Sequence, residues 1–529
     1  MPDFSFDLAY PSQRAPVLAL NVVATSQPLA AQAGLRMLLA GGNAVDAAVA
    51  CAIALTVVEP TSNGIGADVF AIVWDGTKLH GLNASGRSPG GWTREFFSQF
   101  EEMPARGWHS VTVPGAVSAW VELSARFGKL PLAQLFEPAI DYAANGYLVS
   151  PITSVAWQRA VDVFAGAEFA SFRQTFAPHG RAPRAGELFS VADHAKSLEE
   201  IARTRGESFY HGDLAEKIGS HARECGGLLA ESDLAAHRCD WVEPISVGYR
   251  DATLHEIPPN GQGIAALVAL GILEHFDLPG MPVDSPDALH LQIEATKLGL
   301  ADAYAQVADA DFMKVTARQL LDAARLKRLA GSIDRSRACE SFPFEARHGG
   351  TVYLTAADAS GMMVSFIQSN FRGFGSGVVV PGTGIAMQDR GCGFVLDSEH
   401  PNCVGPRKRP FHTIIPGFVT RNRKPLMSFG VMGGPMQAQG HVQMISRTFD
   451  FGQNPQAASD APRWRADGGR IVSVERGFSD QVLDDLKSKG HDVRIAAAGE
   501  FGGAQLIYKL GDGYFAASDH RKDGQALGF

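Results

Sequence analysis

Two glycines stand directly before a threonine that opens a strand-like run of residues. Gly349 and Gly350 precede Thr351, and residues 351–358 read Thr-Val-Tyr-Leu-Thr-Ala-Ala-Asp. If the chain is cut before Thr351, this residue gains a free α-amine beside its own hydroxyl, so one residue supplies both a nucleophile and a base. An α-amine titrates near about pH 8 in model peptides, so no histidine is needed to activate the hydroxyl.

The same hydroxyl could also make the cut. In the uncut chain the Thr351 oxygen could attack the carbonyl carbon of Gly350, and glycine leaves the backbone there unobstructed and tolerant of strain. Taken alone, a threonine that opens a strand is ordinary, and a structural role is the simpler interpretation. The hypothesis of cleavage between Gly350 and Thr351 therefore depends on the rest of the chain.

Several short motifs lie along the chain, and their order helps to interpret Thr351. The set resembles the gamma-glutamyltransferase family of N-terminal nucleophile hydrolases, nearly from end to end, and this reverses the structural interpretation. Residues 364–369 and 374–379 look especially similar to the cytoplasmic, oxamate amidohydrolase-like branch of that family. The motifs are residues 41–49 (Gly-Gly-Asn-Ala-Val-Asp-Ala-Ala-Val), 58–60 (Val-Glu-Pro), 62–66 (Ser-Asn-Gly-Ile-Gly), 113–115 (Val-Pro-Gly), 258–263 (Pro-Pro-Asn-Gly-Gln-Gly), 382–384 (Gly-Thr-Gly), 408–410 (Lys-Arg-Pro) and 433–434 (Gly-Gly).

The resemblance assigns catalytic roles to three more residues. Gly433 and Gly434 match the family's paired glycines, whose backbone N–H groups face the developing oxyanion, although a turn before a helix would explain them as well. Ser369 lies eighteen residues after Thr351, where the family has a second hydroxyl near the nucleophile. The two hydroxyls would face each other on adjacent strands only if the hairpin at residues 359–360 is tight.

The positions that bind the glutamyl group in the family carry different residues here. The family's arginine for the α-carboxylate is replaced by Ser85, and Arg87 follows two residues later. The acid that pairs with the α-ammonium is replaced by Gly393, a neighbouring polar residue by Arg390 and an asparagine by Phe371. The cradle that would select a glutamyl group is therefore largely absent.

Three further residues complete the expected substrate site. His412 and Thr413 occupy the place of the family's two serines, and Asn370 precedes Phe371. A cation at position 390 would repel a glutamyl amine and would suit an acyl group that ends in a carboxylate, or a small acid amide. The alternative is that Arg390 pairs with Asp389 or Asp397 at the surface.

Composition and charge exclude several other classes of protein. The 529 residues carry a net charge of −9 with no long basic run, so a nucleic-acid partner has no electrostatic support. The N-terminus does not look like a secretory signal, which favours a cytoplasmic protein. The most apolar stretch, residues 44–58, is too short to cross a membrane. Six cysteines without paired spacing argue against a metal site and disulfides, and we expect no cofactor.

The pattern of elements indicates a mixed α/β (α+β) protein. Periodicity predicts strands at residues 17–24, 69–74, 78–83, 351–357, 362–368, 412–419 and 424–429, and helices at 29–39, 44–58, 263–276, 286–307, 437–449 and 480–490, with residues 116–330 mostly helical. The resemblance implies a four-layer αββα sandwich. Residues 335–350 should be exposed and irregular. We expect fragments 1–350 and 351–529 to form a heterodimer, possibly paired into a heterotetramer.

These inferences together predict an autoprocessed threonine amidohydrolase or acyltransferase that acts on a small acyl amide through an acyl-Thr351 intermediate. The alternatives are a true gamma-glutamyltransferase or glutathione hydrolase, a cephalosporin acylase-like enzyme, and a binding protein that kept the fold without activity. Asp519 and His520 look like half of a charge relay, but we expect a structural role for them. Cys392 lies in the substrate loop, where packing is its expected role.

Overall fold

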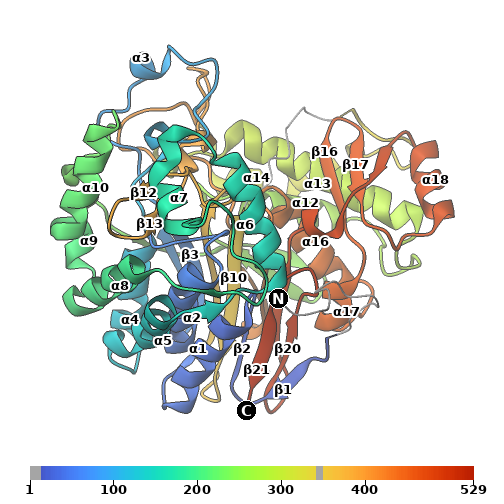
Figure 1. Cartoon of the computed structure of the whole chain (residues 1–529). Coiled ribbons are helices and arrows are strands. Elements are labelled where there is room, and N and C mark those ends of the chain that lie inside the picture. The colour runs from blue at the N-terminus through green and yellow to red at the C-terminus, as the bar shows by residue number, and fades with distance from the viewer. Residues whose placement is uncertain (1–13, 341–349) are drawn as a thin grey trace.

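The computed structural model describes residues 14–340 and 350–529, which form two stacked β-sheets between two layers of helices (Figure 1). Each sheet has seven strands. The first sheet has the order β21-β2-β10-β11-β3-β4-β7, and the second has the order β1-β20-β19-β15-β14-β9-β8. This is the four-layer αββα sandwich that the resemblance implied.

The first sheet consists of β21 (Gln525–Gly528), β2 (Val22–Thr25), β10 (Gly350–Ala357), β11 (Met363–Phe371), β3 (Asp68–Trp74), β4 (Leu79–Ala84) and β7 (Asp240–Val242). The second consists of β1 (Val17–Ala19), β20 (Tyr514–Ser518), β19 (Ala504–Lys509), β15 (Lys424–Val431), β14 (Gly417–Arg421), β9 (Ala252–Glu256) and β8 (Ile245–Tyr249). Every strand pairing within these two sheets is antiparallel.

Helices cover the outer face of each sheet (Figure 1). On the first sheet lie α1 (Pro28–Leu39), α2 (Ala44–Val58) and α4 (Ala116–Phe127), with α5 (Leu132–Asn145) and α8 (Ala192–Thr204) outside them. On the second sheet lie α12 (Gly263–Leu273), α16 (Met436–Phe449) and α17 (Pro455–Asp460), with α13 (Pro286–Gln306) outside α12. The shorter helices include α6 (Pro151–Val163), α7 (Ala170–Phe176), α10 (Asp213–Glu224), α15 (Ala323–Ser332) and α18 (Asp480–Ser488).

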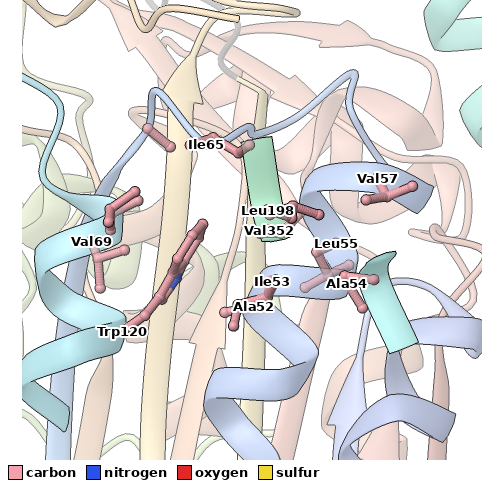
Figure 2. Close-up of a cluster of buried hydrophobic side chains, with 14 of the residues drawn as sticks. Ala52, Ile53, Ala54, Leu55, Val57, Ile65, Val69, Trp120, Leu198 and Val352 are labelled. Carbon is pink, nitrogen blue, oxygen red and sulfur yellow. The ribbon is translucent and has the colours of Figure 1, made fainter. Parts of the chain in front are cut away.

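Helix α2 shows how local sequence places an element against the sheet that carries Thr351. All of its residues are buried, because small and apolar side chains occupy every face. Asn43 caps its N-terminus by accepting hydrogen bonds from the N–H groups of Val45 and Asp46, which confirms the predicted cap. Figure 2 shows α2 side chains such as Leu55 near Val352 of β10 and Trp120 of α4. The start of β10 is therefore held by a rigid, fully packed layer.

The strands of each sheet alternate between two cores. Val352 and Leu354 of β10 pack toward α2, whereas Tyr353 belongs to the core between the two sheets, together with Phe70 and Ile367. Both faces of β10 and β11 are buried, so a slip by one residue would move every side chain of a strand into the opposite core, which is packed around different side chains. This packing fixes the register on which the site depends.

The structure corrects three of the predicted elements. The strand expected at residues 17–24 divides into β1 and β2, which belong to different sheets. The strand expected at 412–419 begins only at Gly417, because the backbone of His412 bonds to Asn260 instead of to a sheet. The mostly helical region 116–330 also contains β7, β8 and β9, which form one edge of each sheet. Residues 341–349 of the segment expected to be exposed lie outside the described residues, and residues 335–337 are exposed and irregular.

Both sheets draw strands from both sides of the Gly350–Thr351 bond. In the first sheet β10, β11 and β21 follow this bond except for Gly350 itself, while β2, β3, β4 and β7 precede it. In the second sheet β14, β15, β19 and β20 follow it, while β1, β8 and β9 precede it. Neither part of the chain contains all the strands of either sheet.

Candidate active site

A short chain of hydrogen bonds joins the hydroxyl of Thr351 to the peptide bond that precedes it. The Thr351 Oγ1 donates to Ser369 Oγ at 3.1 Å, and Ser369 Oγ donates to the carbonyl oxygen of Gly350 at 2.7 Å. Thr351 is 1% exposed and Ser369 is fully buried. Ser369 therefore bridges the hydroxyl of Thr351 and the carbonyl oxygen of the preceding peptide bond.

A bulge in the β10–β11 pair gives these two side chains their positions. Gly350 lies opposite Phe371 and Val352 lies opposite Gln368, so the register shifts at Thr351. Phe371 has a φ of +77°, a conformation that is strained for a bulky residue, and its N–H donates to Ser369 Oγ at 2.8 Å. The strain is held in place by β10 and β11, and it directs a backbone donor at the Ser369 hydroxyl.

The turn between β15 and α16 contains the paired glycines. Gly433 and Gly434 have φ values of +118° and +62°, which favour glycine. Among the residues that the structure describes, no acceptor is found for either N–H group. Gln437, in the first turn of α16, reaches toward Thr351 Oγ1, with 3.5 Å between its Nε2 and this oxygen. The turn therefore lies next to Thr351 and contains two N–H donors without partners in the described part of the chain.

Gln262 positions this turn and was not identified from the sequence as a site residue. Its Nε2 donates to the carbonyl oxygens of Gly434 at 2.9 Å and of Thr413 at 2.5 Å. Gln262 belongs to the motif at residues 258–263. The motif therefore indicated that this residue matters, but it did not indicate what the residue does. Gln437 carried no such signal.

Arg390 is buried at the other end of the same network. Its side chain is 1% exposed, which contradicts the alternative of a surface ion pair with Asp389 or Asp397. One amino group donates to Thr413 Oγ1 at 2.8 Å, and the guanidinium lies over the ring of Phe371 at 4.7 Å. Its Nε and Nη2 have no hydrogen-bond partner among the described residues.

Asn370 adds a second buried group without partners. Its side chain is fully buried, and neither its Oδ1 nor its Nδ2 is hydrogen-bonded within the described chain. Buried polar atoms without a hydrogen-bond partner are rare in folded proteins, and such atoms commonly bind a ligand or a water molecule. The segments of Asn370 and Arg390 are in contact, because the backbone carbonyl of Asn370 accepts from the N–H of Asp389 at 3.1 Å and Arg390 stacks on the ring of Phe371.

His412 forms a buried pair with Asp68, which the sequence analysis did not single out. The His412 Nε2 lies 3.1 Å from Asp68 Oδ2, and His412 Nδ1 accepts from the N–H of Ile414 at 3.3 Å. Burial, and then the charges of Arg390 and Arg409, keep the pKa of His412 below its ordinary value, so the neutral ring donates from Nε2. Burial raises the pKa of Asp68 to about 7, despite the charge of Arg390.

The structure gives Ser85 and Arg87 different surroundings. Ser85 is buried, and its hydroxyl bonds to Asn83 at 2.7 Å and accepts from the amide of Asn260 at 3.2 Å. Asn260 also accepts from the backbone N–H of His412, so Ser85 joins the network of the site. Arg87 instead pairs with Asp309 at 2.7 Å and lines a separate hollow with Arg407 and Arg409.

Comparison with known proteins identifies this arrangement. Residues 30–529 match the profile of the family described as gamma-glutamyltranspeptidase. The chain belongs to the gamma-glutamyltranspeptidase family. It is therefore an enzyme of the N-terminal nucleophile hydrolase class, as the motifs predicted.

Individual relatives of this family member cover nearly its whole length. The glutathione hydrolase-like YwrD proenzyme of Bacillus subtilis (strain 168) is 37% identical over 96% of this chain and 98% of its own. The oxamate amidohydrolase proenzyme of Klebsiella pneumoniae is 34% identical over 95% and 97%. The crystal structure of a cephalosporin acylase from Bacillus halodurans superposes with a TM-score of 0.96 at 48% identity, over 100% of this chain and 99% of that one.

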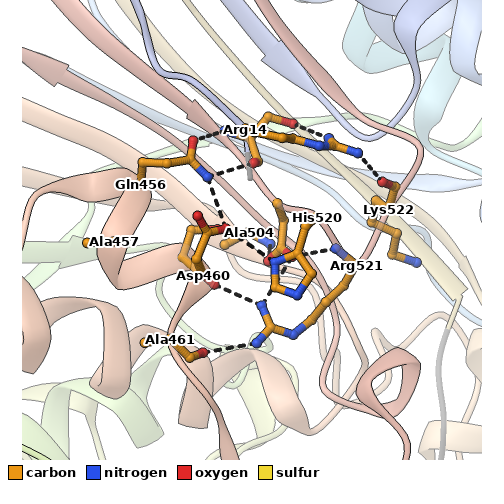
Figure 3. A network of polar contacts seen from close by, with 12 residues as sticks. Arg14, Gln456, Ala457, Asp460, Ala461, Ala504, His520, Arg521 and Lys522 are labelled. Carbon is orange, nitrogen blue, oxygen red and sulfur yellow. Dashed lines mark hydrogen bonds and ion pairs between the residues drawn. The ribbon is translucent and has the colours of Figure 1, made fainter. Parts of the chain in front are cut away.

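Asp519 and His520 have the structural role that the sequence analysis expected in this gamma-glutamyltranspeptidase-family protein. Asp519 is fully buried and accepts from Arg463, from Arg521 and from the N–H of Ala504. These arginines, although opposed by burial, hold the pKa of Asp519 well below its ordinary value. Figure 3 shows Ala504 and Arg521 of this network with His520 beside them, and His520 Nδ1 lies 3.2 Å from Asp460 Oδ1. No contact links it to Thr351 among the described residues.

One group of side chains could in principle hold a metal ion. His290, Glu294 and His491 have ligand atoms within 4.8 Å of one another. The ammonium group of Lys297 pairs with Glu294 at 2.9 Å, and Glu294 also accepts from the N–H of Cys339 at 3.0 Å. A protein cation and a backbone donor therefore already occupy the carboxylate, and the group anchors residues 334–339.

Among the described helices, none has the length and apolar character that crossing a membrane requires.

Proposed function

We propose that this member of the gamma-glutamyltranspeptidase family cuts itself before Thr351 and then hydrolyses amides whose acyl group carries a carboxylate but no ammonium group. The observation that carries the second half of this proposal is Arg390. It is a buried cation whose Nε and Nη2 have no acceptor among the described residues, and the side-chain amide of Asn370 is likewise buried without a partner. A substrate carboxylate would accept from both groups.

The position of Gly393 supports an acyl group without an ammonium. A Cβ added to Gly393 would lie 2.7 Å from the carbonyl oxygen of Phe411, so an acidic side chain does not fit there without a backbone shift. This chain therefore has no carboxylate at the position where the family pairs the α-ammonium. Arg390, at the neighbouring position, would repel that ammonium.

Self-cleavage would begin with the hydrogen bonds already present. Thr351 Oγ1 attacks the carbonyl carbon of Gly350, Ser369 accepts the hydroxyl proton, and Ser369 donates its own proton toward the carbonyl oxygen. The new Oγ1–C bond gives a tetrahedral intermediate whose hydroxyl group holds this proton. As the C–N bond breaks, the proton passes from that hydroxyl group to the nitrogen, which leaves as the neutral α-amine of Thr351, and the carbonyl forms again as an ester. Water then hydrolyses the ester, which frees the Thr351 hydroxyl and leaves a carboxyl group on Gly350.

Substrate hydrolysis would use the same oxygen with a new base. The free α-amine of Thr351 accepts the hydroxyl proton while Oγ1 attacks the substrate carbonyl, and the N–H groups of Gly433 and Gly434 stabilise the oxyanion. The amine then donates this proton to the leaving nitrogen, and the amide C–N bond breaks. A water molecule, or an acceptor amine, resolves the acyl-Thr351 ester.

The relatives support this proposal by their names. Those from Bacillus subtilis and Klebsiella pneumoniae are both named as proenzymes, which fits a chain that is cut before it acts. Oxamate, which the second relative's name gives as its substrate, is an amide whose acyl group carries a carboxylate and no ammonium. Other relatives, about as long, are named glutathione hydrolases, so a gamma-glutamyl substrate remains the alternative that the experiment must separate.

Replacement of the nucleophile tests self-cleavage. Thr351→Ala removes the attacking oxygen, so we expect a folded, full-length and inactive chain on a denaturing gel. Thr351→Ser keeps a hydroxyl and should still yield two fragments. N-terminal sequencing of the smaller fragment should begin at Thr351, and any other first residue would overturn the assignment.

A matched set of anilides tests the acyl group. Glutaryl-, gamma-glutamyl- and butyryl-4-nitroanilide share one leaving group and differ only in a carboxylate and an ammonium. We expect the glutaryl compound to have the highest kcat/KM, and Arg390→Gln to raise its KM about tenfold or more, because a charge-assisted hydrogen bond is lost. Arg87→Gln is the control, since Arg87 is already paired with Asp309. If the gamma-glutamyl compound is cleaved preferentially and Arg390→Gln leaves the KM values unchanged, the substrate is instead a gamma-glutamyl compound.

A further inference from the structure

A hollow of about 520 Å³ opens directly beside the bond that is proposed to be cut. Gly350 and Gly433 both line it, so it touches the scissile peptide and the oxyanion turn at once. Arg390 does not line it. We name this space the outer hollow, and its remaining walls come from α6, from the loop at residues 372–375 and from residues 499–502 and 522.

Basic side chains dominate the wall of the outer hollow. Arg106, Arg159, Arg372 and Lys522 line it, and Glu500 is the single acidic residue among the lining residues. Glu500 already has a basic partner outside the hollow, since Arg465 lies 3.7 Å from its carboxylate. The outer hollow therefore carries an excess of positive charge.

The basic residues have few acidic partners of their own. Arg372 lies 3.9 Å from the buried carboxylate of Asp389. No carboxylate lies within ion-pair distance of Arg106, Arg159 or Lys522 in the described part of the chain. Arg106 instead stacks on Phe164 at 5.0 Å. Burial, and then the charge of Arg372, lower the pKa of Arg106, which shows that these two cations share one environment.

An apolar wall faces these charges. Ala156, Ala160 and Val163 of α6 line the outer hollow, followed by Phe164. The position of α6 is fixed from the C-terminal part of the chain, because Asp523 accepts from the N–H groups of Ile152 at 3.1 Å and Thr153 at 2.9 Å. Asp523 adjoins Lys522, so the same turn that supplies a cation also anchors the apolar wall.

The geometry points to the outer hollow as the site of the leaving amine, and to a substrate whose amine part has an apolar skeleton bearing a carboxylate or another anionic group. This inference rests on the proposed function. A substrate carbonyl held at Gly433 carries its acyl group and its amine on different sides. The outer hollow is lined by Gly433 and not by Arg390, so the amine is assigned to it. Cations around an apolar wall would select an amine that is both anionic and hydrophobic.

The test uses two substrates that differ only in the leaving group. Glutaryl-4-nitroanilide and glutaryl-3-carboxy-4-nitroanilide have the same acyl part, and only the second carries a carboxylate on the ring. We expect the carboxylated anilide to have a kcat/KM about tenfold higher at low salt, and this ratio to fall toward one as added salt screens the charges.

Variants assign this preference to the hollow. Arg159 and Arg106 are exposed, so Arg159→Gln and Arg106→Gln leave the core intact, and each should reduce the preference about threefold. Arg318→Gln is the matched control, because Arg318 is an exposed arginine that does not line the outer hollow, and it should leave the ratio unchanged. Equal cleavage of the two anilides, or a preference that both hollow variants retain, would overturn the inference.

A binding measurement separates failure of this inference from failure of the proposed function. If neither anilide is cleaved, the proposed acyl group is wrong, and the two released amines are titrated into the self-cleaved enzyme instead. Tighter binding of 5-amino-2-nitrobenzoate than of 4-nitroaniline, weakened by Arg159→Gln, would still support the outer hollow. Equal binding of the two amines would refute it.

Discussion

At the scale of single residues, the site is built from buried polar groups whose charge is set by burial. His412 is neutral, Asp68 has a raised pKa, and Arg390 keeps a charge that Asp68 and Asp389 favour and burial opposes. Glu59, in the motif at residues 58–60, is a further buried carboxyl close to the outer hollow. Its Oε2 accepts from Ser26 at 2.5 Å, and burial raises its pKa from 4.5 to about 7.

This shift predicts how Glu59 affects stability with pH. Because the folded-state pKa exceeds the unfolded value, the protonated carboxyl contributes stability below about pH 4.5, and this contribution is lost as the pH rises through about 7. Glu59→Gln keeps a neutral side chain at every pH. We expect the free energy of unfolding of the variant, relative to that of the wild type, to increase by an amount on the order of 3 kcal/mol between pH 5 and pH 8. Unfolding midpoints measured across this range would run parallel for the two proteins if Glu59 were not responsible.

At the scale of elements, the site depends on two irregularities in otherwise regular strands. One is the bulge at Thr351, and the other is the glycine turn that joins β15 to α16. Gln262 ties this turn to Thr413, and Thr413 in turn bonds to Arg390. Hydrogen bonds therefore connect the proposed oxyanion turn to the proposed carboxylate site.

Two substitutions at Gly434 test the oxyanion turn. Gly434→Ala keeps the N–H group and must accept a φ of +62°, at a cost of about 1–2 kcal/mol. Gly434→Pro removes the N–H group and cannot adopt that φ. We expect turnover to fall by about a hundredfold or more in the proline variant, well beyond the alanine variant, with smaller changes in KM. Equal activity in two variants with comparable melting temperatures would place the oxyanion donors elsewhere.

At the scale of the whole molecule, the proposed cut would break the chain without changing the fold, because the two sheets hold both parts together. Both sheets contain strands from both sides of the Gly350–Thr351 bond, and the core between the sheets uses side chains from both parts, such as Phe70 and Tyr353. Separation of the fragments would expose this entire core to water.

We therefore predict that residues 1–350 and 351–529 stay together after cleavage. Size-exclusion chromatography of the cut enzyme should give one peak that contains both fragments, at low salt and at about 1 M salt, because salt screens charges but does not weaken apolar burial. The elution volume also distinguishes a heterodimer from a heterotetramer. Separation of the fragments in salt alone, without unfolding, would contradict the prediction.

The sequence by itself was sufficient to predict the family, the fold and the best-formed helices. Thr351 followed from the chemistry of a hydroxyl beside a future α-amine, and the motif order led to the family that the comparisons established. Helix α2 was predicted with its cap and both ends, because capping and helix termination depend on residues that are close in the chain.

Only the tertiary structure decided how the site is assembled. Asp68 and His412 are 344 residues apart, and Gln437 and Thr351 are 86 apart, so no local pattern could pair them. The different surroundings of Ser85 and Arg87, the burial of Arg390 and the excess of cations in the outer hollow likewise depend on which distant segments meet. Local propensity selects helices, strands and caps, whereas contacts between segments far apart in the chain determine which polar groups are buried, paired or left for a ligand.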